Sequence, residues 1–457
     1  MSRRAVALAL ALVLTVPWLS VAHAAGDDVT VSKLDNGVTV MVRENRVAPV
    51  VAIALLLRMG SRWETPANAG ISNFTHAVMV KGTTKRSGGE IADTVADLGG
   101  KISAAGEVDY SGIQATALAR FWRELLGITA ELALSPALSP VEVDRERDWL
   151  LSRLQRRHDN APARAFDAFY ATIYAGHPYA LPSLGTRESL ARIDHAAIVA
   201  WYRAFYRPER MTLVVSGQVT AAEVVAEARR LFGGLPAGPL APEPRIPPPS
   251  APARRVVIQA PAQQTQILAG GVAPSLDHPD HAAVKVLSTI LGGGMAGRLF
   301  VELRDKSALA YTAAAYYDPV REPGALVLYL GTAPENGAKA EQALLEEVRK
   351  IREVPVPADE LARAKGYLLG RYAMDRRTNE RLAWYLAFYE VEGVGRGYPE
   401  RYRRQVEAVT AADVQRVART YLGTLGSVML GPRLGGGLRP PSDGRRTAGA
   451  VLLPASP

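Results

Sequence analysis

A chain of 457 residues is too long for one ordinary hydrophobic core, so its length predicts more than one domain. Its hydrophobic content of 48% and charged content of 22% are typical of a folded globular protein. The net charge of +9 is spread over mixed acidic and basic segments, which argues against a nucleic-acid-binding surface.

Residues 1–24 have the pattern of an export signal. Arg3 and Arg4 form a basic start, residues 5–16 form an apolar run, and Ala22-His23-Ala24 is an A-x-A cleavage site. The alternative is an uncleaved anchor, because the apolar run approaches the length of a short membrane span. No later run is long enough to span a bilayer, and the lack of cysteine excludes lipid attachment, disulfides and thiol catalysis. We therefore expect a periplasmic or secreted protein.

The first half of the mature chain, residues 25–235, alternates between strand-like and helix-like patterns. Asn36-Gly37 is a strong hairpin signal between two short strands. Residues 50–57 form a nearly continuous apolar run, which is typical of a strand in a covered sheet. Further strands are predicted at 102–118 and 211–215, and helices at 91–98, 122–134, 142–157 and 196–205 and from 220 onward.

A proline-rich segment separates this half from a second one. Residues 236–254 include eight prolines, which predict an extended connector between domains. Beyond it, residues 409–414 align with 193–198 at an offset of 216, which indicates a duplicated unit in a second domain at 255–432. The Gly- and Pro-rich tail, 433–457, is predicted to be flexible.

One stretch between Gly70 and Gly82 dominates the first half. Its apolar residues recur at helical spacing, and a glycine ends it, so a helix is predicted. This helix resembles the one that carries the inverted zinc motif, H-x-x-E-H, in the pitrilysin-like (M16) metallopeptidases. The resemblance extends over residues 29–431, and it also rests on three further motifs: Gly176-His177-Pro178-Tyr179, Leu184-Gly185-Thr186 and Leu291-Gly292-Gly293-Gly294.

The resemblance implies an α/β (α+β) fold of two homologous M16-type domains. Each domain would have a mostly antiparallel sheet backed by helices, and the two halves would close around a peptide chamber. The metal-binding motif is degenerate, because Asn73, His76 and Ala77 replace its histidine, glutamate and histidine. The window for the third ligand, residues 150–154, holds an arginine and no acid. We therefore expect no metal and no intrinsic catalytic residue in this chain.

The second half keeps residues that match the substrate-contacting pair of M16 enzymes, whereas the first half has lost the metal ligands. M16 enzymes supply an arginine and a tyrosine, seven residues apart, to the zinc-bound peptide, and Arg304 and Tyr311 match that spacing. A guanidinium can bind a substrate carbonyl, and a phenol can donate a hydrogen bond to an oxyanion. The alternative is that Arg304 is a surface helix residue and Tyr311 a buried strand aromatic. The first half also has Ser103 where active members generally have an asparagine.

These residues predict a non-catalytic subunit of a heteromeric M16 peptidase. Its partner would be a zinc-bearing M16 subunit, in a heterodimer or a dimer of dimers, and its substrate a peptide added as a strand to a sheet edge. No zinc or other cofactor is expected in this chain itself. One alternative is a scaffolding subunit without a role in proteolysis, and another is an active peptidase with an atypical metal site.

Overall fold

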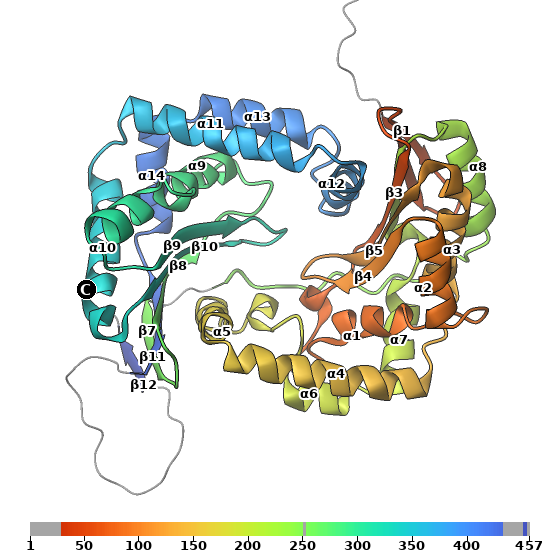
Figure 1. Ribbon diagram of the computed structural model, residues 1–457, viewed down its shortest axis with the longest axis horizontal. Helices are drawn as coiled ribbons and strands as arrows, with labels where there is room; N and C mark the ends of the chain where they lie inside the picture. Colours follow the sequence, from red (N-terminus) through yellow and green to blue (C-terminus); the bar gives the residue numbers. More distant parts are fainter. Residues whose placement is uncertain (1–28, 250–252, 433–450, 455–457) are drawn as a thin grey trace, which may run out of the picture.

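The computed structural model describes residues 29–249, 253–432 and 451–454, and these form two six-stranded sheets with helices around them (Figure 1). The predicted signal peptide, 1–24, lies outside the described residues. The predicted alternation of strands and helices is confirmed, and each sheet is backed by helices. The predicted α/β (α+β) fold of two halves, each with a sheet backed by helices, is therefore confirmed.

The first half supplies all six strands of one sheet. These strands are β1 (Val29–Lys33), β2 (Thr39–Glu44), β3 (Val50–Leu57), β4 (Lys101–Gly106), β5 (Ser111–Leu118) and β6 (Met211–Gly217). Its helices are α1 (Ile71–Met79), α2 (Gly88–Asp97), α3 (Trp122–Leu134), α4 (Pro140–Asp159), α5 (Ala161–Ile173), α6 (Arg187–Arg192), α7 (His195–Phe205) and α8 (Ala221–Phe232). Short helical turns are η1 (Ser61–Trp63), η2 (Ala119–Phe121), η3 (Pro178–Ala180) and η4 (Pro208–Arg210).

The second half builds the other sheet. Its strands are β7 (Arg254–Gln259), β8 (Thr265–Val272), β9 (Thr312–Asp318), β10 (Ala325–Thr332), β11 (Gly426–Gly431) and β12 (Val451–Pro454). Its helices are α9 (His281–Gly292), α10 (Gly337–Glu353), α11 (Ala358–Asp375), α12 (Asn379–Val391), α13 (Tyr398–Ala408) and α14 (Ala411–Tyr421). A π-helical segment, η5 (Phe300–Lys306), and a short turn, η6 (Pro334–Asn336), complete it.

The two sheets have the same design. Their strand orders are β1-β2-β6-β3-β5-β4 and β12-β7-β11-β8-β10-β9, so each strand has a counterpart in the other sheet. Among the described strands, the β2–β6 and β7–β11 pairs are parallel, and the other neighbours are antiparallel. The duplication inferred from the offset of 216 is thus visible as two copies of one sheet.

The tail departs from its prediction in one place. Strand β12 lies within the predicted flexible tail and pairs antiparallel with β7, in the position that β1 holds beside β2. An apolar stretch that covers the free edge of β7 satisfies backbone groups that would otherwise face solvent. The rest of the tail, 433–450 and 455–457, lies outside the described residues.

Each half lends one helix to the other half. Helix α5 packs on the second sheet, where Phe169 and Ile173 join a buried cluster with Leu268 and Val428. Helix α12 packs on the first sheet in the corresponding way, through small residues such as Ala383 that lie against β3 and β6. Fully burying one large apolar side chain contributes about 2 kcal/mol, so this exchange couples the two halves strongly.

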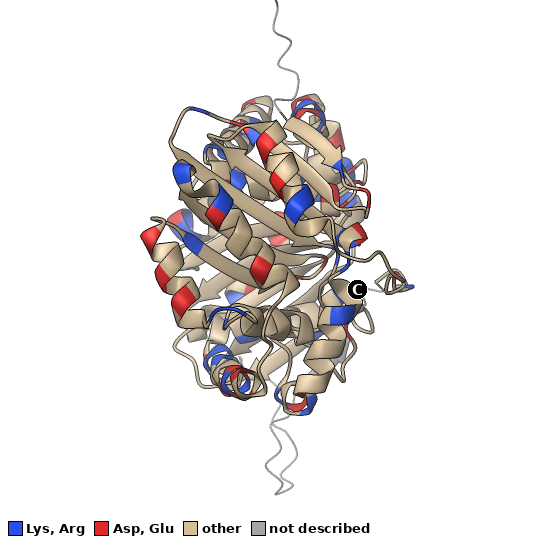
Figure 2. Ribbon diagram, turned by 90° about the vertical axis from the view of Figure 1, so that its right-hand side faces the viewer, with Lys and Arg blue, Asp and Glu red and all other residues tan. Residues whose placement is uncertain are grey.

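The remaining helices cover the opposite faces of the sheets. Helices α1, α3, α7 and α8 share the larger core of the first sheet, and α9, α10, α13 and α14 share that of the second. Within the described ranges, no helix combines the length and the apolar character that a membrane span requires. Acidic and basic residues are interspersed along the exposed helices, and many of them form ion pairs within one helical turn (Figure 2).

Candidate functional site

Helix α1 carries the degenerate motif, and a buried carboxylate fixes its start. Glu64 accepts hydrogen bonds from the backbone N–H groups of Gly70, at 2.7 Å, and Ser72, at 2.9 Å. These are first-turn donors that the helix itself leaves unpaired. Burial raises the pKa of Glu64 to about 7, although both hydrogen bonds act to lower it. The carboxylate therefore has a structural role at the start of α1.

Two glycines, Gly70 and Gly185, allow the loop before α6 to pack closely against the start of α1. Gly70 and Gly185 have φ values of +89° and +79°, a region that favours glycine. A Cβ atom on Gly70 would lie 2.7 Å from the Cα of Gly185, and one on Gly185 would lie 2.3 Å from the carbonyl oxygen of Ala69. The Leu184-Gly185-Thr186 motif thus serves to hold the start of α1.

His76 points into the core and has both ring nitrogens occupied. Nδ1 lies 2.8 Å from the carbonyl oxygen of Ser72, and Nε2 lies 2.8 Å from the hydroxyl of Tyr206. A carbonyl can only accept, so Nδ1 donates and Nε2 accepts from Tyr206. Burial lowers the pKa of His76 to about 4, so the ring is neutral at pH 7. No lone pair of His76 is left for a metal ion.

The other two motif positions offer no metal ligand. Asn73 and Ala77 are half-buried and lie one turn apart on α1, where the end of β4 approaches closely. The Nδ2 of Asn73 is buried and has no hydrogen-bond partner among the described residues. An amide and a methyl group do not make a zinc site.

The neighbouring helix α4 does not supply the missing ligands. Its Arg153 places the guanidinium 4.7 Å from the ring of Trp149. Its acidic Glu146 is already paired with Lys81 at 2.6 Å. Within the described ranges, no three His, Asp or Glu side chains gather to hold a metal ion. The residues present at this position therefore do not fit the zinc that the motif implies.

The pair in the second half has a different environment. Arg304 is exposed on η5, with its guanidinium 4.7 Å from the ring of Phe300, and no acidic side chain of the described residues forms an ion pair with it. Tyr311 is 61% exposed and directly precedes β9, whereas the alternative interpretation predicted a buried strand aromatic. Its backbone N–H is fixed to the carbonyl of Gly331 at 2.8 Å, so the chain is held while the phenol is free to reach outward.

The turn between these two residues folds the chain back. Ala308 has a left-handed φ of +51°, which is unfavourable for a residue with a Cβ atom. The N–H groups of Leu309 and Ala310 both bond to the carbonyl oxygen of Leu303, at 2.8 and 3.1 Å. The structure thus places Arg304 and Tyr311 on either side of one hydrogen-bonded turn, in a different half from Asn73, His76 and Ala77.

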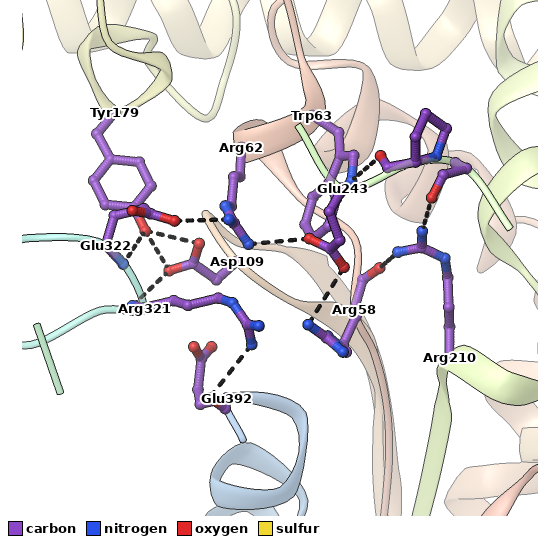
Figure 3. Close-up of polar contacts among 12 residues, drawn as sticks. Arg58, Arg62, Trp63, Asp109, Tyr179, Arg210, Glu243, Arg321, Glu322 and Glu392 are labelled. Atoms are coloured by element: carbon purple, nitrogen blue, oxygen red, sulfur yellow. Dashed lines mark hydrogen bonds and ion pairs between the residues drawn. The ribbon is translucent and has the colours of Figure 1, made fainter. Parts of the chain in front are cut away.

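A polar cluster that was not predicted from the sequence joins the two halves (Figure 3). Arg62 pairs with Glu243 of the linker at 3.2 Å and with Glu322 of the β9–β10 loop at 2.6 Å. Tyr179 donates to the carboxylate of Asp109, at 2.7 and 2.8 Å, and the same carboxylate accepts from the N–H of Arg321. The loop of the second half is thereby attached to the first half.

Two acids in this cluster have altered acidity. Burial raises the pKa of Asp109, although the hydrogen bond from Tyr179 acts to lower it. Burial and the nearby Asp109 raise the pKa of Glu392 to about 8. The Gly176-His177-Pro178-Tyr179 motif pointed to one member of this cluster, Tyr179. Its partner Asp109 lies 70 residues away in the sequence, so the motif could not predict the contact between them.

A cavity of about 920 Å3 lies beside this cluster, between the end of α4, helix α5, the loop before α6, and strands β7, β9 and β10. Tyr174 and Tyr179 line it from the first half, and Tyr316 and Val320 line it from the second. Its lining includes neither Arg304 nor Tyr311. A chamber between the halves was expected only from the family resemblance, and no sequence motif pointed to this set of lining residues.

The chain matches family models and known proteins over both halves. A family model described as Insulinase (Peptidase family M16) matches residues 39–187, and one described as Peptidase M16 inactive domain matches residues 192–368. The chain is 26% identical, over 416 residues, to a Rickettsia bellii protein named an uncharacterized zinc protease, covering 89% of this chain and 98% of that protein. A Mycobacterium tuberculosis protein with the same description is 28% identical over 385 residues, with 83% and 88% covered.

A solved structure shows the same fold. The crystal structure of a peptidase M16 inactive domain from Pseudomonas fluorescens superposes with a TM-score of 0.83 at 23% identity, covering 90% of this chain and all of that one. The two family models together span most of residues 39–368. The chain belongs to peptidase family M16, and it lacks the inverted zinc motif of that family.

Proposed function

We propose that this chain is the non-catalytic subunit of a heteromeric M16 peptidase and assists a zinc-bearing M16 partner. The observation that carries the proposal is the contrast between its two halves. His76 is buried with both ring nitrogens occupied, whereas Arg304 and Tyr311 are exposed and without an internal ionic partner among the described residues.

The exposed pair suits the binding of a peptide at the moment of hydrolysis. The guanidinium of Arg304 would hold a substrate carbonyl with charge-assisted hydrogen bonds. The phenol of Tyr311 would donate to the oxyanion that develops during attack, a contact that is stronger in the transition state than in the ground state. No shielding group has to move, because both side chains already face solvent.

The sheet edges offer a way to hold the peptide backbone. Strands β4 and β9 each lie at one end of their sheet, so among the described residues each has one edge without a neighbouring strand. A peptide that adds to such an edge gains main-chain hydrogen bonds with little dependence on its sequence. In this proposal the peptide runs along an edge strand, and both chains work in the cell envelope after removal of the signal segment.

The test is reconstitution with a zinc-bearing M16 chain from the same organism. We expect Arg304→Ala with Tyr311→Phe to lower kcat/KM of the complex for a peptide substrate about 100-fold or more, because one oxyanion donor alone contributes a factor of this size. The matched control is Lys306→Ala, since Lys306 lies on the same segment and pairs with Glu302.

Two results would contradict the proposal, and each would support an alternative function. If the double variant supports full partner activity while the complex still forms, a scaffolding subunit is the correct description. If the purified chain alone contains zinc and cleaves peptides in a chelator-sensitive way, the chain is an active peptidase with an atypical site.

A further inference from the structure

We propose that the cavity between the halves binds a large apolar or aromatic peptide side chain next to a carboxylate group. This inference rests on the proposed function in one respect: it takes the ligand to be a peptide. The cavity, of about 920 Å3, is large enough for more than one residue of an extended chain. Its walls come from both halves, so it depends on the way the two halves are joined.

The apolar part of the cavity is formed by aromatic rings and small side chains. Tyr170 and Tyr174 line it from α5, Tyr316 from β9, and Val320 and Ala325 from the β9–β10 region. The rings of Tyr170 and Tyr174 are stacked with centroids 6.2 Å apart. Rings with a polar tip suit another aromatic or a large aliphatic side chain, which gains area burial and edge contacts. Burial raises the pKa of Tyr170 to about 12, so its hydroxyl remains a neutral donor.

Positive charge collects on the first-half wall. Arg157 is neutralised by Asp167 through two hydrogen bonds of 2.6 and 2.8 Å. Arg164 and Arg187 also line the cavity, and neither forms an ion pair with an acidic side chain in the part of the chain that the structure describes. The guanidinium of Arg187 donates a hydrogen bond of 3.4 Å to the amide oxygen of Gln155. Two guanidiniums without acidic partners beside an apolar surface favour a ligand that carries a carboxylate.

The second-half wall carries the opposite charge. Asp318 of β9 lines the cavity and is exposed. Among the described residues it forms no ion pair with Arg164 or Arg187, so it does not hold either guanidinium in a direct contact. A carboxylate-bearing ligand is therefore attracted to the arginine wall and disfavoured at the Asp318 wall.

The floor of the cavity is fixed before any ligand arrives. Tyr179, which lines the cavity, donates to Asp109 and accepts from the N–H of Glu322 at 3.1 Å. Tyr174 donates to the carbonyl of Pro323 at 2.9 Å. These contacts attach the β9–β10 loop to the first half, so the binding surface is preorganised and little ordering cost remains.

A carboxylate next to an apolar residue has two sources in peptides, the free C-terminus and an acidic side chain. We would measure binding to the full chain by fluorescence anisotropy with labelled ten-residue peptides. One ends in phenylalanine with a free carboxylate, a second ends in phenylalanine amide, and a third ends in Glu-Phe amide. A fourth ends in alanine with a free carboxylate.

We expect at least one carboxylate-bearing phenylalanine peptide to bind about ten-fold more tightly than the uncharged amide, as a charge-assisted contact implies. If the free-acid phenylalanine peptide binds more tightly than the Glu-Phe amide peptide, the recognised carboxylate is the C-terminus. If the Glu-Phe amide peptide binds more tightly, it is the acidic side chain. The alanine peptide should bind about ten-fold more weakly than its phenylalanine counterpart, because it buries less apolar area.

Substitutions of lining residues test whether the preference for carboxylate-bearing peptides arises in the cavity. Arg164→Gln should remove most of the preference for the carboxylate, and so should Arg187→Gln, which changes an exposed side chain and leaves folding intact. Asp318→Asn is the matched control within the cavity and should leave carboxylate binding equal or tighter. Arg156→Gln is the control outside the lining, on the same helix as Arg157, and should change nothing.

Three outcomes overturn the inference: no peptide binds at millimolar concentration, the uncharged amide binds as tightly as the acids, or both arginine variants behave like Arg156→Gln. The proposed function is judged separately. Arg304→Ala with Tyr311→Phe should leave this binding unchanged while partner-dependent cleavage is lost, since neither residue lines the cavity.

Discussion

The motif helix α1 and the η5–β9 segment hold the two sets of positions to which the family resemblance points, and they have opposite environments. On α1, His76 is fully buried, with both nitrogens bound inside the protein. On the η5–β9 segment, Arg304 and Tyr311 face solvent and only their backbone is fixed. The first position is thus part of the buried core, whereas the second is open to solvent.

The comparison predicts that changes on α1 mainly affect folding. His76→Ala should lower the free energy of unfolding by about 4 kcal/mol, because it leaves a cavity and an unpaired buried hydroxyl on Tyr206. Urea unfolding at pH 7.5 measures this. Tyr206→Phe, which keeps the ring, should cost only about 1 kcal/mol. A loss of less than 1 kcal/mol in His76→Ala would mean that the histidine is not a structural residue.

The next largest loss of unfolding free energy is expected where Gly185 packs closely against Ala69, at the start of α1. Gly185→Ala should cost about 3 kcal/mol, since the new Cβ atom would lie 2.3 Å from the carbonyl oxygen of Ala69 in addition to the strain of a positive φ. Gly176 has the same φ of +79° but no heavy atom near its missing Cβ, so Gly176→Ala should cost only about 1 kcal/mol. Equal losses in the two variants would show that the contact with α1 contributes nothing.

The pH dependence of stability should report the buried imidazole. The pKa of His76 is about 4 in the folded protein and 6.5 when unperturbed, so the unfolded chain binds more protons between these values. The contribution of neutral His76 is complete above pH 6.5 and decreases as pH falls toward 4, by up to about 1.4 kcal/mol per pH unit. The difference in unfolding free energy between wild type and His76→Ala should shrink over this range. A constant difference from pH 7.5 to 4.5 would argue against a buried neutral ring.

The smallest effect is expected in the second half. Arg304→Ala and Tyr311→Phe should each change the free energy of unfolding by less than about 0.5 kcal/mol, because both side chains are exposed. Thermal and urea unfolding at pH 7.5 check this. Losses above 1 kcal/mol would mean that these residues support the fold and are not free to contact a peptide.

Much of the fold followed from local patterns in the sequence. The Asn36-Gly37 turn, the apolar run of β3 and the repeat at an offset of 216 are all visible as paired strands and duplicated sheets. The exchange of α5 and α12 between the halves was not predicted. An amphipathic pattern indicates that a helix face is buried, but it does not indicate which sheet covers that face.

The site was predicted in part, from residue types and spacing. Helical spacing placed Asn73, His76 and Ala77 on one helix, which the structure has as α1. The hydrogen bond from Tyr206 to His76 spans 130 residues, and the ion pair of Arg62 with Glu322 spans 260, so neither leaves a signal in local sequence. The exposure of Tyr311 depends on the turn at Ala308, whose left-handed φ is atypical of alanine.

The most direct test of the division between the halves is to measure metal content and peptide cleavage for the purified chain, alone and with its zinc-bearing partner. We expect less than stoichiometric zinc and no cleavage by the chain alone, and cleavage with the partner that depends on Arg304 and Tyr311. Stoichiometric zinc together with chelator-sensitive cleavage by the isolated chain would contradict it.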